Sequence, residues 1–337
     1  MTTTISLATS NCIVLGCDSL GTISNPYVPW ISIYQHLFES NGNPKTDANG
    51  VPVTLTSEKL FELSQPIPSN QIPSLTKLFP LGKPKEHLPV GLLFAGLASL
   101  GAKSLKTIIE EFQESAGFKT AAKKMDSLTK ALSEHLDKEY KASSQYYSPM
   151  EVIVSGYSKG SHDPEIWKIV IKYGDEPEIT ECNEDPSRYS IVFGGQHDVI
   201  QRVVNGIDDR GWGVAIHQAY FALGLYQERL KNYLQGNGYT GDVPDFNTLV
   251  PKSEERFDFP FAYSRLSSEL RFFSEQAAIE FVEFLVDLMI KSQQFSDRLP
   301  TVGGEIHIGL ITPSDGFRWM SEEAYKTRFH AVSKHKE

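Results

Sequence analysis

Short runs of β-branched and apolar residues open the chain. Two such runs, residues 3–8 and 12–17, are separated by the polar turn Thr9-Ser10-Asn11, and this pattern predicts a β-hairpin. A second hairpin is predicted from residues 76–81 and 90–96. The N-terminal segment is therefore expected to be built into a β-sheet.

The rest of the chain alternates between helical and strand-like patterns. Apolar residues recur every three or four positions in residues 105–112 and 125–140, which predicts two helices. Residues 197–233 also have a helical pattern, with a break expected at Gly211-Trp212-Gly213. Ser274 is predicted to cap a further helix with an apolar face. Strands are expected at 150–156, 166–172, 189–193 and 305–311.

The order of these elements predicts the fold class. Strands come first, paired helices follow, and strands return, which favours two sheets with helices packed outside over alternating β-α-β units. We therefore expect an α+β protein, a four-layer αββα sandwich, as a single domain over residues 1–337. Long insertions are expected at about 22–74, where Pro, Asn, Ser and Gly are frequent, and at about 205–272.

Composition and charge narrow the possible partners and the location. The chain has 32 Lys and Arg against 42 Asp and Glu, a net charge of −10, which disfavours nucleic acid and anionic membranes as partners. No apolar run approaches the roughly 20 residues of a membrane span, and the N-terminus lacks signal-peptide features. Three cysteines, an odd number, fit a reducing compartment, and we interpret Cys12, Cys17 and Cys182 as buried thiols. A cytoplasmic location is expected.

The second residue carries the candidate chemistry. Removal of Met1 would leave Thr2 with a free α-amine beside its own hydroxyl, which places a nucleophile and its base in one residue. An α-amine has an ordinary pKa of about 7.7–8.0 and can accept the hydroxyl proton near neutral pH. A nearby cation would keep that amine neutral, and Lys77, paired with Asp18, is the candidate.

Four short features stand out together: the start Thr2-Thr3-Thr4-Ile5, the run from Ile13 to Ser19 that places Asp18 sixteen residues after Thr2, the segment Thr76-Lys77-Leu78-Phe79, and the turn Ala95-Gly96. In these features the sequence resembles the proteasome β-subunit family of N-terminal nucleophile hydrolases, which includes the bacterial HslV peptidase. The resemblance covers the first hundred or so residues and the later order of strands and helices.

The resemblance implies an activity and roles for these residues. Thr2 would be nucleophile and base, Asp18 and Lys77 the charge pair, and the backbone N–H of Gly96 the oxyanion donor. The implied function is that of a threonine-type endopeptidase or other amide hydrolase, acting on a peptide or other amide substrate and needing no cofactor. It also implies self-association, commonly in rings.

The sequence departs from the family pattern at several positions. The stretch between Asp18 and Lys77 is longer than the family's, so Lys59, in a similar run, is a rival for the lysine role. Gly194 stands where the family has a serine. Leu299 and Val302 fall near the family's final aspartate and serine, and Asp297 or Thr301 are possible substitutes after a small shift.

Other functions stay open. A non-catalytic structural or interaction protein on the same fold is favoured by Gly194, Leu299 and Val302. A serine hydrolase centred on Ser158, in a Gly-x-Ser-x-Gly match, needs a helix directly after the serine, whereas residues 166–172 look like a strand, so a hairpin turn is preferred. The nine histidines have no metal-ligand spacing, so no metal site is expected.

Overall fold

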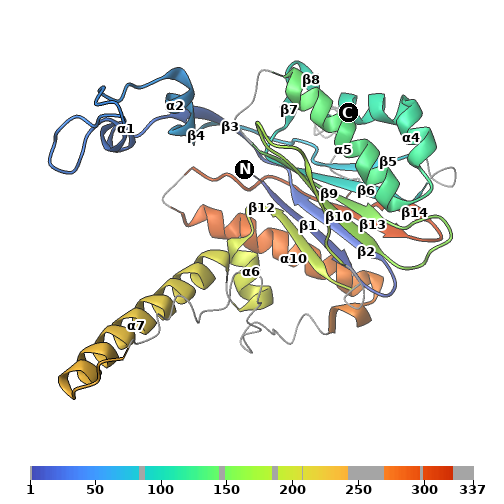
Figure 1. Ribbon diagram of the computed structural model, residues 1–337. Coiled ribbons are helices and arrows are strands. Elements are labelled where there is room, and N and C mark those ends of the chain that lie inside the picture. Colours follow the sequence, from blue (N-terminus) through green and yellow to red (C-terminus); the bar gives the residue numbers. More distant parts are fainter. Residues whose placement is uncertain are drawn as a thin grey trace, which may run out of the picture.

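Two antiparallel five-stranded sheets form the centre of the molecule (Figure 1). The computed structural model describes residues 2–82, 88–143, 149–183, 189–206, 208–241, 269–296 and 299–321. The expected α+β class is confirmed, with strands and helices both abundant and every strand pairing in the two large sheets antiparallel.

The N-terminal strand is an interior strand of the first sheet, paired on both sides. The strand order is β12 (Ile191–Gly195), β1 (Thr3–Ala8), β2 (Ile13–Asp18), β13 (Ile306–Thr312) and β14 (Gly316–Trp319). Side chains of β1 alternate between the two faces of this sheet, as the pleat requires. Ile5 and Leu7 pack in the core beneath the helices, whereas the Ser6 hydroxyl contacts that of Ser155 in the other sheet at 2.8 Å.

The second sheet carries the second predicted hairpin. Its order is β11 (Glu178–Glu181), β10 (Glu165–Ile171), β9 (Met150–Gly156), β6 (Val90–Ala95) and β5 (Leu78–Leu81). Leu78, Leu93 and Ile153 from this sheet share one buried cluster with Ile13 and Leu15 from the first. The two sheets therefore face each other across a common apolar layer.

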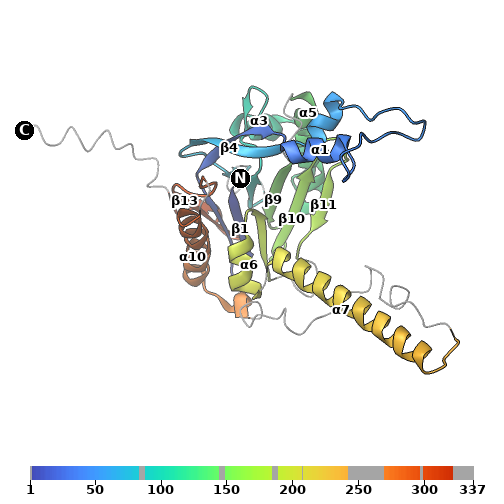
Figure 2. The same ribbon diagram turned by 90° about the vertical axis from the view of Figure 1, so that its left-hand side faces the viewer.

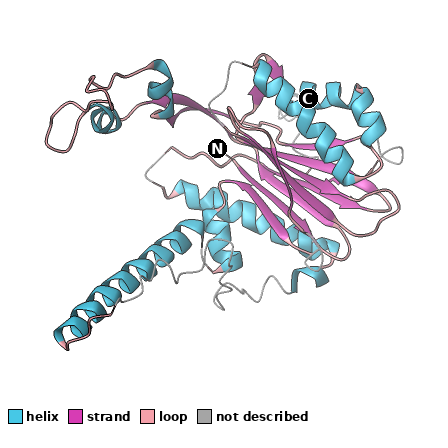
Figure 3. Ribbon diagram, viewed as in Figure 1, coloured by secondary structure: helices cyan, strands magenta, loops and turns pink. Residues whose placement is uncertain are grey.

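Helices cover the outer face of each sheet (Figure 3). The helix α10 (Glu275–Gln294) and the short α6 (Asp198–Asn205) pack on the first sheet, and α10 begins as predicted, with the Ser274 side chain accepting from the Ala277 N–H. On the second sheet lie α3 (Leu105–Glu114), α4 (Ala116–Ala121) and α5 (Met125–Ala142), preceded by the small hairpin of β7 (Ser99–Leu100) and β8 (Lys103–Ser104). A 3-10 turn, η1 (Leu270–Phe272), leads into α10.

The first expected insertion forms an ordered arm. Residues 21–72 contain β3 (Gly21–Tyr27), α1 (Trp30–Leu37), α2 (Ser57–Glu62) and β4 (Gln65–Ile72), and the two strands pair along their length. The arm projects beside the N-terminus in both views (Figures 1 and 2). In the described part of the chain β3 and β4 pair only with each other, so Pro66 and Pro68, which cannot donate to a wider ladder, are tolerated in β4.

The second expected insertion contains a long helix. The predicted break at Gly211-Trp212-Gly213 is wrong, since α7 (Asp209–Gly236) runs through it. The chain turns earlier, at Gly206, which ends α6 with a φ of 80°, and Asp208 then caps α7 by accepting from the Gly211 N–H. Residues 242–268 of this insertion lie outside the described residues.

The three cysteines were expected to be buried thiols. Cys12 and Cys17 are buried free thiols, as predicted, whereas Cys182 is only half-buried, because β11 is an edge strand. Burial raises the pKa of the Cys17 thiol well above its ordinary value, which keeps it protonated.

Across the described ranges, we find no helix with both the length and the apolar character of a membrane span.

Candidate active site

Thr2 is held in place through its backbone. It directly precedes β1 and is 3% exposed, and its carbonyl accepts a 2.7 Å hydrogen bond from the Gln196 N–H just past β12. Gly195 makes this approach possible, because its φ of 66° suits glycine and a Cβ there would lie 2.1 Å from the Thr2 carbonyl oxygen. The first sheet therefore fixes the position of Thr2.

Asp18 accepts hydrogen bonds from four parts of the chain. It is the last residue of β2 and is fully buried. One carboxylate oxygen accepts from the Thr2 hydroxyl, from the Thr3 N–H at 3.0 Å and from Lys77 Nζ at 2.8 Å. The other accepts from the N–H groups of Leu20 at 3.2 Å and Gly303 at 3.0 Å. These donors satisfy a carboxylate that burial would otherwise destabilise.

Lys77 completes the cluster from the second sheet. Its side chain is 9% exposed, and its ammonium donates to the Thr2 hydroxyl oxygen, to Asp18 and to the Leu20 carbonyl at 2.6 Å. An ammonium has three N–H donors, so these three contacts use all of them. The Lys77 carbonyl in turn accepts from the Phe94 N–H at 2.9 Å, which ties the lysine to β6.

The arm explains how Asp18 and Lys77, which are 59 positions apart in the chain, come into contact. Its base is closed by a 2.7 Å hydrogen bond from the Leu75 N–H to the Ser19 carbonyl, one residue past Asp18. The extra chain length is thus looped out as the arm, and Lys77 returns to the same place. The rival Lys59 lies in α2 of the arm, where it pairs with Glu62.

A segment near the end of the chain closes the floor of the site. The Ser19 hydroxyl accepts from the Glu305 N–H at 2.7 Å, and the Gly303 carbonyl accepts from the Leu20 N–H at 2.8 Å. Gly304 has a φ of 81°, and a Cβ there would lie 2.5 Å from the Ser19 hydroxyl oxygen. Gly304 therefore lets residues 303–305 lie close against Ser19 and Asp18.

The structure shows the surroundings of the positions at which the sequence departs from the family pattern. Val302 is buried in the core under α10, and Leu299 is 41% exposed. The Thr301 hydroxyl donates to the Gln196 side chain at 2.7 Å, beside the backbone that holds Thr2. Gly194 faces Thr4, whose hydroxyl oxygen would lie 2.4 Å from an added Cβ, so a serine would not fit there without movement. Asp297 lies outside the described residues.

Gly96 ends β6 in an exposed position. Its φ of 98° is in the left-handed region, and a Cβ would lie 2.1 Å from the Pro149 carbonyl oxygen, so the turn requires glycine. The preceding Ala95 has its Cβ 3.2 Å from the position that a Cβ on Gly195 would take. Gly96 therefore follows a residue that lies close to the backbone holding Thr2.

Glu151 was missed by the sequence reasoning. Its carboxylate in β9 accepts from the Gly195 N–H at 3.1 Å and pairs with Lys168 of β10 at 3.1 Å. It thereby links the second sheet to the end of β12 that holds Thr2. A charged pair alternating with apolar residues in two strands resembles a solvated sheet face, so no sequence signal marked it.

A buried histidine lies beside the cluster in the first sheet. His307 is opposite Cys17 in the β2 and β13 pairing, is 5% exposed, and stands edge-to-face to Trp319 with ring centroids 6.3 Å apart. Among the described residues, no hydrogen-bond partner is found for its Nδ1. Burial, the largest influence, lowers the pKa of His307 below its ordinary value; Glu305 and Asp18 oppose this shift and Lys77 adds to it.

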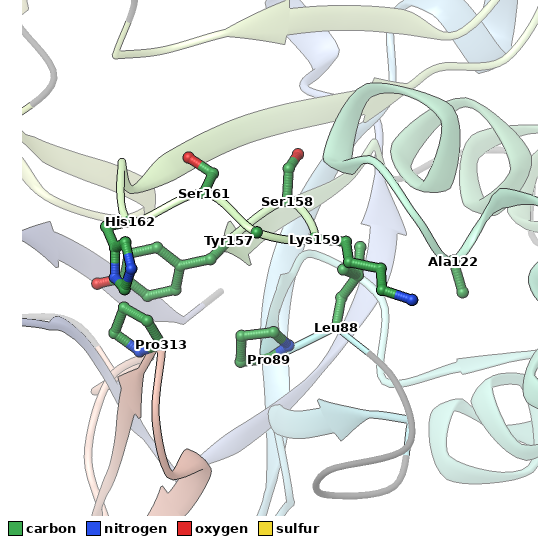
Figure 4. A pocket seen from close by; sticks show the side chains of 10 residues that line it. Leu88, Pro89, Ala122, Tyr157, Ser158, Lys159, Ser161, His162 and Pro313 are labelled. Carbon is green, nitrogen blue, oxygen red and sulfur yellow. The ribbon is translucent and has the colours of Figure 1, made fainter.

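Ser158 lies at the opposite ends of β6 and β9 from this cluster. It is in the turn between β9 and β10, which confirms the predicted hairpin, and its hydroxyl contacts Glu165 and accepts from the Met125 N–H at 3.0 Å. A cavity of about 290 Å³ is lined there by Tyr157, His162 and Pro313 among others. In Figure 4 the Ser158 hydroxyl points away from Tyr157 and His162. The strand-turn-helix of a serine nucleophile is absent from this described segment.

One group in the described ranges has the composition of a metal site. Glu111, His135 and Glu139 bring their ligand atoms within 4.8 Å of one another on α3 and α5. Lys103 Nζ lies 2.8 Å from Glu111 and 3.0 Å from Glu139, and hydrogen bonds to both carboxylates raise its pKa. A lysine therefore already supplies the positive charge of this cluster.

Comparisons with known proteins give weak similarities. No family model matches the chain, and no curated protein matches it either. Solved structures of Anbu from Hyphomicrobium sp. strain MC1 align at a TM-score of 0.46, with 10% identity for one and 11% for its Gly-1 mutant, covering 99% and 100% of this chain and 98% of each. Anbu from Yersinia bercovieri, described as an ancestral beta-subunit, aligns at 0.43 and 12% identity, covering 98% of this chain and 92% of its own.

These findings correct the family expectation from the sequence. Membership in the proteasome β-subunit and HslV family is contradicted, because no model of a family matches and the similar structures are Anbu proteins at very low identity. The features behind that resemblance were few and short, so they do not establish descent. At these TM-scores the similarity to Anbu carries no argument about activity.

The ion pair generates a prediction about stability. Replacing Asp18 by Asn leaves the Lys77 ammonium buried without its counter-charge, so the free energy of unfolding should fall by about 3–5 kcal/mol. Urea unfolding of both proteins measures this difference. The matched control is Lys59→Ala, which breaks the exposed pair with Glu62 and should change stability by about 0.5 kcal/mol or less. A loss below about 1 kcal/mol in Asp18→Asn would contradict the structural role of the pair.

The shifted histidine generates a prediction about pH. The pKa of His307 is lower in the folded protein than in the unfolded chain, where it is about 6.5. As the pH falls through that value, the unfolded state therefore binds more protons than the folded state, and the free energy of unfolding decreases. The slope of unfolding free energy against pH should therefore be smaller in His307→Phe between about pH 7 and pH 5. The same change at the exposed His217 is the control, and an unchanged slope in His307→Phe would refute the assignment.

Proposed function

We propose that this chain is an amide hydrolase, a threonine-type peptidase or a related amidohydrolase, in which Thr2 is the nucleophile once Met1 has been removed. The observation that carries the proposal is the contact of the Thr2 hydroxyl with both members of a buried ion pair, Asp18 and Lys77. Burying the Lys77 ammonium is unfavourable by itself. Beside the Thr2 hydroxyl, however, it can stabilise the negative charge that develops on Oγ1 when that oxygen attacks.

The proposed chemistry uses the two groups of Thr2. Its α-amine takes the proton from Oγ1, and Oγ1 attacks the substrate carbonyl carbon. The amide C–N bond then breaks, and the leaving amine takes the proton held by the Thr2 ammonium, leaving an ester on Oγ1. Water, deprotonated by the same amine, hydrolyses the ester, releases the acid and restores the hydroxyl.

The surrounding residues would assist at stated atoms. The Lys77 ammonium would stabilise negative charge developing on Oγ1, and Asp18 would hold that ammonium in position. The Gly96 N–H would donate to the oxyanion of the tetrahedral intermediate. Gly96 suits this role because it is exposed and lies in a turn that excludes a side chain.

The same proposal extends to the architecture. We assign the two facing sheets and their outer helices to a four-layer αββα sandwich and treat residues 1–337 as one domain with two insertions. The substrate would be a peptide or other amide, in the cytoplasm, with self-association of the chain. Support comes from the shared core between the sheets and from helices on each outer face.

A non-catalytic interaction protein is the second candidate function. It is favoured by Gly194, Leu299 and Val302, which supply no hydroxyl or carboxylate: Gly194 faces Thr4, Leu299 is exposed and Val302 is buried in the core. An amine with few polar neighbours is poorly oriented, and orientation contributes much of an enzyme's rate. The two candidates make opposite predictions for hydrolysis.

Substitution of Thr2 tests the proposed function. Wild-type protein from which Met1 has been removed should cleave members of a mixed peptide library, measured as new amino groups. Thr2→Ala should reduce this cleavage on the order of 10⁴-fold or more, because it removes the nucleophile. Thr2→Ser keeps a hydroxyl and should retain measurable cleavage, and Ser158→Ala, at the far end of the sheets, should leave it unchanged.

Two results would contradict this proposal. Cleavage by Thr2→Ala at the wild-type rate would exclude Thr2 as nucleophile. A folded wild-type protein that lacks Met1 and cleaves nothing in the library would favour the non-catalytic candidate. Circular dichroism of each variant establishes that the fold is retained.

A further inference from the structure

The helix α7 is exposed along most of its length. It projects away from the sheets in both views (Figures 1 and 2), and among the described elements it contacts α6. From Trp212 to Tyr226 it contains no Asp, Glu, Lys or Arg. Several of its large apolar side chains are highly exposed, including Phe221 at 60%, Tyr226 at 62% and Tyr233 at 68%. A contiguous apolar surface of this kind marks an interaction site.

Part of this surface follows a coiled-coil spacing. Apolar residues recur at alternating steps of four and three along one side of the helix: Trp212, Ile216, Ala219, Leu223, Tyr226, Leu230 and Tyr233. This is the 3.5-residue repeat with which helices pack knobs into holes. We call these seven residues the α7 stripe. The charged residues of the outer half, Glu228, Arg229 and Lys231, lie away from it.

We propose that the α7 stripe binds the α7 stripe of a second copy of this chain. An identical helix brings the same repeat, so the two stripes are complementary by symmetry, and no charged residue of either stripe opposes another. At about 1.5 Å per residue the 28-residue helix is about 42 Å long, which lets two bodies of net charge −10 stay apart while their uncharged helices pack.

Three residues of the stripe expose much of their apolar surface: Leu223 is 42% exposed, Tyr226 62% and Tyr233 68%. Full burial of an aromatic side chain removes about 150–250 Å² from water, so the two tyrosines would contribute most of the apolar area that pairing buries. A membrane surface is a poorer occupant, because a helix that lies on membranes carries a basic polar face, which α7 lacks.

Analytical ultracentrifugation of the whole chain tests this pairing, independently of any hydrolytic activity. Wild-type protein should sediment with at least twice the 37.7 kDa chain mass at high concentration. The double variant Leu223→Glu, Tyr226→Glu places charges in the stripe and should weaken association at least tenfold. The matched control is Phe221→Glu, an equally apolar and exposed position on the opposite side of the helix, which should still associate.

Each other outcome overturns the proposal. A wild-type chain that is monomeric at every concentration would show that the stripe has a different partner. Undiminished association of the double variant would show that copies meet through another surface, and equal loss in Phe221→Glu would exclude the stripe as the contact. The milder pair Leu223→Ala, Tyr226→Ala, with circular dichroism of all variants, separates lost pairing from lost folding, since alanine favours the helix.

Discussion

The buried ion pair between Asp18 and Lys77 joins the segments that meet at Thr2. Asp18 ends a strand of the first sheet and Lys77 precedes a strand of the second, and each contacts the Thr2 hydroxyl. Burial of two charges is unfavourable unless their hydrogen-bonding capacity is satisfied. The backbone groups of Thr3, Leu20 and Gly303 provide that satisfaction, so their positions depend on the pair and the pair on them.

This dependence explains several features that look incidental in the sequence. The glycines at 195 and 304 have positive φ, and a Cβ at either would lie too close to the Thr2 carbonyl or the Ser19 hydroxyl. The arm of residues 21–72 leaves and returns between the two charged residues, so its length does not disturb their contact. The two long additional segments, the arm and the one that contains α7, therefore lie outside the cluster.

Local patterns were sufficient to predict much of the fold. Two hairpins, the helices near 105 and 125, and the Ser274 cap depend on neighbouring residues, and the structure contains them. The sequence also indicated Thr2, Asp18 and Lys77, which the structure brings into contact. Contacts of Gln196, Glu151 and Gly303 were not predicted, because they join residues far apart in the chain through backbone groups. The break before α7 was misplaced, because glycines alone do not end a helix that Asp208 caps.

The most direct test of the account is the intact mass of the purified protein before and after treatment with a threonine-directed epoxyketone, with the adduct mapped by peptide sequencing. Such a reagent needs both an N-terminal amine and an activated hydroxyl on the same residue. The account predicts that the protein lacks Met1 and gains one adduct, on Thr2. A folded protein that lacks Met1 and remains unmodified at Thr2 would contradict it, because the ion pair would then hold a hydroxyl that does not react.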